Sequence, residues 1–405
     1  MGKTNEYMQT VTEYSQIEIP KLVDSLLLDG ITAGASDIHI EAWETCVAVR
    51  LRLSGVLTQL VNLPLEFIDR ITARFKVMAN MISYQNDLPA EGRVEANALY
   101  GGTELRVSIF PNVWGGKIVV RIFDPRNRSF DLAHLGLEED IREKLATLLG
   151  RPNGLILFTG PTGCGKTTTI YSALMHIVQR AGASVSISTV EDPVEFRLPM
   201  ISQSQINLAK DFTYAMALRS LLRQDPQVIM VGEIRDVDTA VIALQAGLTG
   251  HLVISTIHSG SSSGVFARLM NMEVEPFLLA SSIIGVVGLR LLRTNCPHCA
   301  LPYDPEPALL RYVPAEVIPH ANFMKGPGCE ACLNTGFAGR TALAELLAVD
   351  DTFREAVLQK MPTRSLQQVA TQQGMSTFWQ LALRRALKGQ TSLEEVFRVV
   401  ALDQV

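Results

Sequence analysis

The segment 160–167, GPTGCGKT, fits the G-x-x-x-x-G-K-[ST] pattern of a phosphate-binding loop. In such a loop, backbone N–H groups point at the β-phosphate, and glycines permit the close approach. Lys166 would place its ammonium on the β- and γ-phosphates, and Thr167 would offer its hydroxyl to Mg²⁺. A pattern this short also arises by chance, but here an apolar segment precedes it and a helical one, TTTIYSALMHIV, follows it. The sequence therefore predicts an ATP site formed by Gly160, Pro161, Thr162, Gly163, Cys164, Gly165, Lys166, Thr167 and Thr168.

Two acidic clusters end apolar segments further along the chain. VEDPVEF holds Glu191, Asp192 and Glu195, and VGEIRD holds Glu233 and Asp236. In a parallel sheet, carboxylates at strand C-termini face the nucleotide crevice. Phosphoryl transfer to water needs a metal anchor and a group that orients or deprotonates the water. Solvated charges at strand ends are the alternative, which the preceding phosphate loop makes less attractive.

His258 closes a third apolar segment, HLVISTIHSG. A single histidine at a strand end often has only a structural role. At this place its ring could instead sense the γ-phosphate through a hydrogen bond. The residues alone leave both interpretations open.

Four cysteines form two C-x₂-C pairs, Cys296/Cys299 and Cys329/Cys332. Four thiolates at this spacing can close a tetrahedron around Zn²⁺, which predicts a structural zinc site that stiffens a loop-rich insert. Two disulfides are one alternative, which a reducing cytosol disfavours. A zinc ribbon that binds nucleic acid is another, and the lack of a basic patch counts against it. We expect the remaining cysteines, Cys46 and Cys164, to be ordinary buried or loop thiols.

Composition predicts a globular protein of two or three domains, since the 405 residues are 47% hydrophobic and 19% charged. The net charge of −5, without clustered Lys and Arg, argues against a protein that wraps nucleic acid. The N-terminal segment lacks the apolar region of a secretory signal. The most apolar stretch, PFLLASSIIGVVGLRLLR, is interrupted by Arg290 and predicts a buried helix rather than a membrane span. We therefore expect a cytosolic protein whose cysteines are reduced unless a metal holds them.

The elements that must position these residues differ along the chain. Alternation over 36–60, broken by the turn signal Ser54-Gly55, predicts strands, as do 104–110 and 117–123, while 65–80 has helical spacing. From residue 150, continuous apolar runs between helical segments predict strands buried on both faces of a parallel sheet. These patterns divide the chain into an N-terminal α+β domain (1–125), a linker (126–137), an α/β ATPase core (138–290), a tetracysteine metal module (291–340) and a C-terminal helical region (341–405).

Taken together, the motifs resemble those of the secretion ATPases that power type II secretion and type IV pilus assembly. GPTGCGKTTTIYSAL is similar to their Walker A segment and STVEDPVEF to their Asp box. ALRSLLRQDPQVIMVGEIRDVDTAVIALQAGLTGHLVISTIHS resembles their Walker B region and His box. Their mobile N-terminal domain has segments similar to ASDIHIEA and LRVSIFPNVWGGKIVVRIFD. The segment that leads to the metal module in the assembly branch is similar to EPFLLASSIIGVVGLRLLRTNCPHC. The resemblance runs from residue 22 to beyond residue 345.

The resemblance implies an α/β fold with a RecA-like P-loop core, a PAS-like N-terminal domain, a tetracysteine zinc module and a helical tail. It implies a homohexamer that hydrolyses ATP at subunit interfaces. This hexamer would be cytoplasmic and peripheral to the inner membrane, where it docks on a platform protein, and it would move pilin or pseudopilin subunits. No direct contact with nucleic acid is expected.

The resemblance also implies roles for individual residues. Glu195 matches the catalytic glutamate, and Glu233 matches the Walker B glutamate that acts through the metal. Arginines at further motif positions are Arg219, Arg223 and Arg235 in the motor half and Arg93, Arg106 and Arg121 in the N-terminal domain. The last three are expected to stabilise γ-phosphate charge from across a domain or subunit boundary, with exposed strand arginines as the alternative.

The chain departs from the family pattern in several places. The His box reads HSGSSSG where Thr-Asn-Asp usually follows the histidine, and Leu289 stands where a glutamine is expected. Residues 90–93 read AEGR in place of QDGR, and 115–117 read GGK in place of Gly-Glu-Lys. These departures weaken the transfer of the His258 and interdomain roles but not of the phosphate and glutamate roles. The large N-terminal extension of many relatives is absent, which indicates a short member or a truncated chain.

Three functions compete. The leading hypothesis is an ATP-driven assembly motor for a pilus or pseudopilus. A related motor for DNA uptake, conjugation-type secretion or pilus retraction is the second, and the paired cysteines, generally lacking in retraction relatives, favour assembly. A non-hydrolysing, ATP-binding ring scaffold is the third, and Lys166, Glu195 and Glu233 argue against it.

Overall fold

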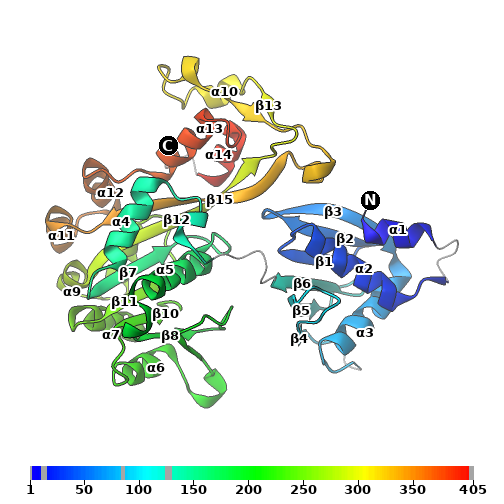
Figure 1. Cartoon of the computed structure of the whole chain (residues 1–405), viewed down its shortest axis with the longest axis horizontal. Coiled ribbons are helices and arrows are strands. Elements are labelled where there is room, and N and C mark those ends of the chain that lie inside the picture. Colours follow the sequence, from blue (N-terminus) through cyan, green and yellow to red (C-terminus); the bar gives the residue numbers. More distant parts are fainter. Residues whose placement is uncertain (1, 11–15, 84–86, 124–129, 401–405) are drawn as a thin grey trace. The chain divides into compact units, whose positions relative to one another are not determined.

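The computed structural model describes residues 2–10, 16–83, 87–123 and 130–400 (Figure 1). The chain divides into two compact units, Met1–Arg128 and Ser129–Val405. Residues 126–129 of the predicted linker lie outside the described residues.

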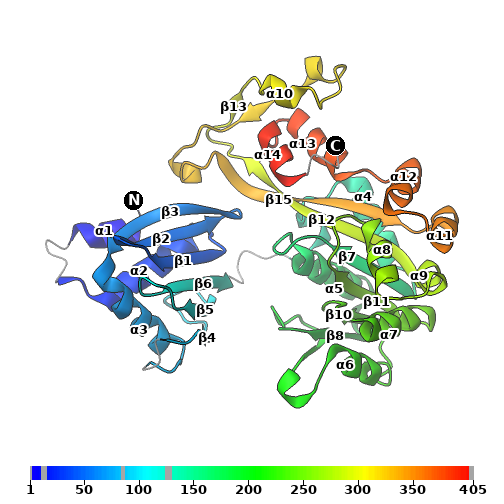
Figure 2. The ribbon, with the colours of Figure 1, turned by 180° about the vertical axis from the view of Figure 1, so that it is seen from behind.

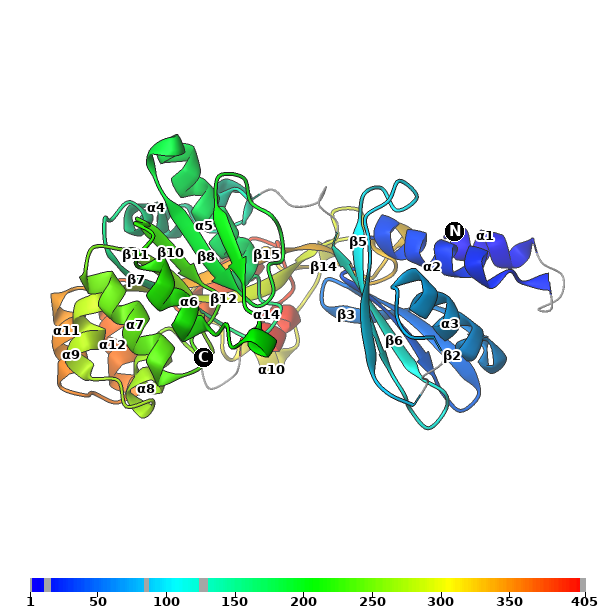
Figure 3. The same ribbon diagram turned by 90° about the horizontal axis from the view of Figure 1, so that it is seen from below.

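The N-terminal unit is a six-stranded antiparallel sheet in the order β3-β2-β1-β6-β5-β4. Its strands are β1 (Asp37–Ala42), β2 (Cys46–Leu53), β3 (Val56–Pro64), β4 (Ala90–Val94), β5 (Glu104–Phe110) and β6 (Lys117–Phe123). Its helices are α1 (Lys3–Gln9), α2 (Ile19–Thr32) and α3 (Ile68–Met78), and they lie on one side of the sheet (Figure 3). The predicted strands and helix are confirmed. Ser54 and Gly55 both have positive φ, of 49° and 87°, as a two-residue hairpin turn requires.

The second unit is built on a seven-stranded sheet in the order β15-β12-β7-β11-β10-β8-β9. Its strands are β7 (Gly154–Thr159), β8 (Ile187–Glu191), β9 (Ser202–Gln205), β10 (Val228–Val231), β11 (Leu252–Ile257), β12 (Ile283–Asn295) and β15 (Phe337–Ala348). All neighbours are parallel except β15, which runs antiparallel to β12. The four apolar runs predicted as parallel strands are β7, β8, β10 and β11, which are contiguous in the sheet, so that prediction is confirmed.

Helices cover both faces of this sheet, which explains why its strands are apolar without alternation. Along β7, Ile156 and Phe158 pack into one core, while Leu155 and Leu157 pack into the other. The first core is completed by α4 (Glu139–Leu149), α5 (Lys166–Ala181), α13 (Phe378–Leu387) and α14 (Leu393–Val399). The second is completed by α6 (Tyr214–Leu221), α7 (Val237–Leu248), α8 (Gly264–Asn271), α9 (Pro276–Ser282), α11 (Asp351–Leu358) and α12 (Thr363–Gln372).

The apolar stretch 276–293 corrects one prediction, because it is not a single buried helix. The helix α9 ends at Ser282, and the chain continues as the strand β12. Paired Ile and Val residues favour a strand, and glycines at 285 and 288 weaken a helix. Between β7 and β15, this segment satisfies its backbone on both sides. Within the described residues, no helix combines the length and the apolar character that crossing a membrane requires.

The strands β12 and β15 also lead to the segment that carries the cysteine pairs. Between them the chain forms β13 (Leu301–Pro302), α10 (Pro307–Leu310) and β14 (Met324–Lys325). Figures 1 and 2 show both strands running out from the sheet to this segment, with α13 and α14 beside them. The hydroxyl of Tyr303 donates to Glu394 at 2.8 Å and so joins the segment to α14.

Candidate active site

The predicted phosphate loop connects β7 to α5. Gly160, Gly163 and Gly165 have φ values of 143°, 76° and 95°, a backbone region that side chains rarely adopt. A Cβ on Gly160 would also lie 2.5 Å from the Leu289 carbonyl oxygen, so space as well as conformation demands glycine. Lys166 is the first residue of α5, and its Nζ donates to the carbonyls of Gly160 (2.8 Å) and Pro161 (3.0 Å). The ammonium therefore lies over the loop, where it can meet phosphate oxygens.

Arg290 lies beside this loop, since a Cβ on Gly160 would be 3.3 Å from its Nη1, and it bonds to the segment after His258. Its guanidinium donates to the carbonyls of Leu289 (2.9 Å) and Gly260 (2.8 Å) and lies 4.7 Å from the ring centre of Phe378. Sequence reasoning treated Arg290 only as an interruption of an apolar run. A charged residue inside a run of apolar residues is the sequence signal that could have marked it.

The Asp-box carboxylates have different surroundings. Glu191 ends β8 and is buried, and its carboxylate accepts hydrogen bonds from Tyr171 Oη, Thr189 Oγ1 (2.5 Å) and Gln203 Nε2 (3.1 Å). Asp192 is exposed, and Glu195 is half-buried. The Glu195 backbone N–H donates to Tyr171 Oη at 3.3 Å. Sequence reasoning missed Tyr171, because nothing in a helical pattern shows that a tyrosine reaches another segment.

Glu233 and His258 follow the adjacent strands β10 and β11, and the structure brings them together. Nε2 of His258 lies 3.9 Å from Oε2 of Glu233, and Arg235 forms an ion pair with the same carboxylate. Burial and the nearby Glu233 carboxylate raise the pKa of Tyr214. Asp236 instead caps α7, since its carboxylate accepts the Thr239 N–H at 2.7 Å. Arg219 and Arg223 lie exposed on and just after α6.

The unusual serines after His258 anchor their loop. Ser259 N–H donates to Thr159 Oγ1 at the end of β7 (2.9 Å). Ser262 Oγ donates to the Glu345 carbonyl (3.0 Å), and Ser263 Oγ donates to Gln367 (2.6 Å). The departure from the family pattern is thus accompanied by a set of contacts that holds the loop against β15 and α12.

The three N-terminal arginines form one row across neighbouring strands. Arg93 is opposite Arg106, Arg106 is opposite Arg121, and Arg121 is opposite Asp37. Arg121 pairs with Asp37 at 3.1 Å, and Arg106 lies 4.4 Å from the ring centre of Phe123. Like charges on directly opposed positions are unfavourable by themselves, so this row concentrates positive charge at a cost to the sheet.

The four paired cysteines form one cluster. Their Sγ atoms all lie within 4.8 Å of one another, and the closest pairs are 3.7 and 3.9 Å apart. Zn–S bonds of about 2.3 Å in a tetrahedron give S–S separations of about 3.8 Å, so the cluster fits zinc. Backbone N–H groups of Cys329 (3.2 Å) and Gly336 (3.3 Å) point at Cys332 Sγ. Burial acts to raise the pKa of Cys332, but hydrogen bonds from these N–H groups and from the Cys329 and Cys299 thiols outweigh it and lower the pKa to about 6, which favours the thiolate ligand.

Known proteins are similar to this chain over most of its length. The model of the type II/IV secretion system protein family matches residues 12–398. The type II secretion system protein E of Aeromonas hydrophila is 39% identical over 385 residues, which are 95% of this chain and 76% of that protein. The type IV pilus assembly ATPase PilB of Myxococcus xanthus is 40% identical over 391 residues, which are 95% of this chain and 68% of PilB. The structure of the pilus retraction motor PilT with bound ADP is similar with a TM-score of 0.60 at 25% identity, covering 93% of this chain and 96% of that one.

Proposed function

Because the chain belongs to the type II/IV secretion system family of ATPases, we propose that it is a motor that uses ATP hydrolysis to assemble a type IV pilus or a type II secretion pseudopilus. The observation that carries the proposal is the edge where β7, β8, β10 and β11 end. The phosphate loop, Glu195, Glu233 and His258 all follow strands whose carboxyl ends meet there. Phosphate binding and water activation can therefore take place at one site.

The loop residues 160–168 would hold the ATP phosphates, with Lys166 on the β- and γ-phosphates and the dipole of α5 adding positive potential. Thr167 would hold Mg²⁺, which when bound neutralises phosphate charge. Glu195 would take the proton of the attacking water. Glu233 would act through the bound metal, and His258, beside it, would donate a hydrogen bond to the γ-phosphate.

We propose that Arg93, Arg106 and Arg121 stabilise the charge that develops on the γ-phosphate, as arginines do in phosphoryl transfer. A homohexamer would then be the active form, acting at the cytoplasmic face of the inner membrane against a platform protein, with pilins or pseudopilins as cargo. The tetracysteine cluster would hold a structural zinc that stiffens the segment between β12 and β15.

A pilus-retraction motor is the second candidate, since the PilT structure is similar in fold. The tetracysteine cluster and the PilB and protein E relatives favour assembly. A related motor for DNA uptake or conjugation-type secretion, and a scaffold that binds ATP without hydrolysis, are the further alternatives.

The variant Glu195→Gln tests hydrolysis directly. It should bind ATP with unchanged affinity, but its turnover should fall by roughly 10²-fold or more, because the water loses its base. Nucleotide titration and phosphate release measure the two quantities. Glu355→Gln, a matched change at an exposed position on α11, should leave both unchanged. Equal losses of binding and turnover in Glu195→Gln would refute a role as base, and wild-type protein that binds ATP without releasing phosphate would support the scaffold.

A further inference from the structure

Tyr171 lies on α5, one and a half turns after the phosphate-loop lysine, and its side chain is fully buried. Its hydroxyl donates to the carboxylate of Glu191 and accepts the backbone N–H of Glu195 at 3.3 Å. The N–H of Phe196 also points to the hydroxyl, and burial together with Glu191 raises the pKa of Tyr171. One oxygen atom therefore joins the helix that follows the phosphate loop to the segment that carries Glu195.

The direction of these hydrogen bonds is settled by the surroundings. A phenol has one proton and two acceptor lone pairs. The proton goes to Glu191, whose carboxylate is itself held by Thr189 Oγ1 and Gln203 Nε2. The lone pairs are left for the N–H groups of Glu195 and Phe196. If the hydroxyl turned away from Glu191, its hydrogen bonds to Glu191 and from Glu195 would be disrupted together.

Ring contacts strengthen the same connection. The ring of Phe130 stacks edge-on against Tyr171 with 5.4 Å between ring centres, and against Phe196 with 5.7 Å. Gln203 adds a further tie, since its Nε2 donates to the Phe196 carbonyl at 3.0 Å. The residue next to Glu195 is thus packed from two sides.

We propose that the Tyr171 hydroxyl is a positioning group for ATP hydrolysis, which holds the backbone of Glu195 in a fixed place relative to the phosphate-loop helix. The inference rests on the proposed role of Glu195 as base. Tyr171 itself does not touch the reacting atoms in this scheme. A displacement of a catalytic group by about 1 Å costs up to about 10²-fold in rate, so a hydroxyl that fixes that group has a measurable effect.

Tyr171→Phe removes the hydroxyl and keeps the ring. We expect kcat to fall by about tenfold or more, because Glu195 is less well placed, while the affinity for ATP stays within about twofold, because Lys166 and the loop are untouched. Ser172→Ala is the matched control. It removes a neighbouring buried hydroxyl of α5 that donates only to the helix's own Thr168 carbonyl (2.9 Å), and it should leave kcat unchanged.

A double-mutant cycle separates positioning from general destabilisation. If Tyr171 acts through Glu195, then Tyr171→Phe combined with Glu195→Gln has the same kcat as Glu195→Gln alone. If the tyrosine only supports the fold, the two rate losses multiply. Full activity of Glu195→Gln would defeat the proposed base and the inference with it. Two results would overturn the inference about Tyr171 but leave Glu195 as the proposed base. One is a slow Glu195→Gln together with a wild-type kcat for Tyr171→Phe, and the other is rate losses that multiply in the double variant.

Should Tyr171→Phe not fold, as judged by circular dichroism, Glu191→Gln takes its place in the cycle. An amide of the same shape can donate to the tyrosine oxygen and compete with the Glu195 N–H. We expect the same pattern: a lower kcat, unchanged ATP affinity and no further loss when Glu195→Gln is added. A wild-type kcat in Glu191→Gln would overturn the inference.

Discussion

Single residues of the same type have different surroundings in this protein. Glu191 and Glu195 lie four positions apart, yet the first is buried with three hydrogen-bond donors and the second is half-buried at the strand edge. Asp236, which the motif also presents as a candidate, caps α7. A carboxylate saturated by protein donors is poorly suited to accept a proton from water. These surroundings favour Glu195 over Glu191 and Asp236 as the proposed base, while Glu233, which pairs with Arg235, keeps its proposed role at the metal.

Lys166→Ala should abolish the preference of the loop for a triphosphate. Its ammonium lies over the loop carbonyls of Gly160 and Pro161, so its loss removes the cation that the loop itself offers to the β- and γ-phosphates. Affinity for ATP should fall at least about tenfold, the scale of one charge-assisted contact. Calorimetric titration with a non-hydrolysable analogue measures this. Lys144→Ala, exposed on α4, is the control, and equal affinity of both variants would contradict the assignment.

Local geometry that depends on short patterns could be predicted from the sequence, and contacts that depend on the fold could not. The phosphate loop is a local structure, so its pattern in the sequence predicts its geometry. Arg290 forms a hydrogen bond with Gly260, thirty positions away, and Tyr171 forms hydrogen bonds with Glu191 and Glu195. Such contacts exist only because β12 is beside β7 and α5 packs on β8. No spacing along the chain encodes them.

At the scale of elements, tertiary pairing explains two wrong predictions: the single helix over 276–293, and the start of the helical region at 341, because β15 extends to Ala348. The segment 276–293 reads as apolar throughout, and periodicity cannot separate a buried helix from a buried strand. From Ile283 onward the segment forms a strand, because β7 and β15 provide backbone hydrogen-bond partners on both sides. The short edge strand β9, with the polar sequence SQSQ, has no apolar signal at all. Strands such as β7 and β11, with continuous apolar runs and turn residues at both ends, were predictable.

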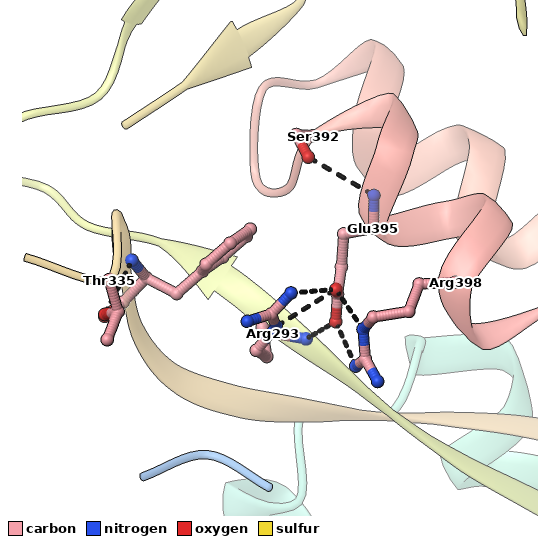
Figure 4. A network of polar contacts seen from close by, with 6 residues as sticks. Arg293, Thr335, Ser392, Glu395 and Arg398 are labelled. Atoms are coloured by element: carbon pink, nitrogen blue, oxygen red, sulfur yellow. Dashed lines mark hydrogen bonds and ion pairs between the residues drawn. The ribbon is translucent and has the colours of Figure 1, made fainter. Parts of the chain in front are cut away.

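A buried ion pair attaches α14 to β12 (Figure 4). The Glu395 side chain is fully buried, and its carboxylate accepts two hydrogen bonds from Arg293, at 2.7 and 3.0 Å, and two from Arg398, both at 2.6 Å. The Arg293 backbone N–H donates to it as well, at 3.0 Å. Burial acts to raise the pKa of Glu395, but the arginines outweigh it and lower the pKa.

Arg293→Met should destabilise the second unit by about 3–5 kcal/mol, because it leaves a buried carboxylate short of its partner. Arg398→Met should cost less, since the Arg398 side chain is 48% exposed and water can replace it. Folding lowers the pKa of Glu395, so the ionised carboxylate contributes to the stability of the fold. This contribution is complete above about pH 4.3, the ordinary pKa of glutamate, and is lost as the pH falls through the lowered pKa. The stability difference between wild type and Arg293→Met, followed by urea unfolding, should therefore narrow on acidification. A difference that does not change with pH would show that the loss comes from packing.

The cysteine segment should depend on metal for its order. Protein purified without chelator should carry about one zinc per chain, and Cys329→Ser should lose it, since one of four thiolates is gone. Hydrogen exchange over residues 296–336 should then speed up, because this segment has few buried apolar residues of its own. Cys46→Ser, a change at the start of β2, is the control. Zinc-free protein whose six thiols all titrate under native conditions would end the zinc assignment.

At the scale of the whole molecule, each of the two units carries its own group of charged residues. The second unit supplies the phosphate loop, the carboxylates and Arg235, which is already paired with Glu233. The N-terminal sheet carries the row of Arg93, Arg106 and Arg121 on the side opposite its helices. Arg121 pairs with Asp37 at 3.1 Å, and Glu104 lies 3.9 Å from Arg93 and 3.8 Å from Arg106. A triphosphate is the kind of ligand that such a row of arginines suits.

If these arginines complete the site in a ring of subunits, activity must depend on assembly. Phosphate release per subunit should climb with protein concentration and level off as rings form, and sedimentation at the same concentrations measures assembly. Arg106→Ala should bind ATP nearly normally but hydrolyse it about 10³-fold more slowly, the scale at which a catalytic arginine acts. Arg70→Ala, an exposed arginine on α3 on the other side of the sheet, should behave as wild type. Either of two results would contradict a site shared between subunits. One is full activity of Arg121→Ala, and the other is an activity per subunit that stays constant on dilution to monomers.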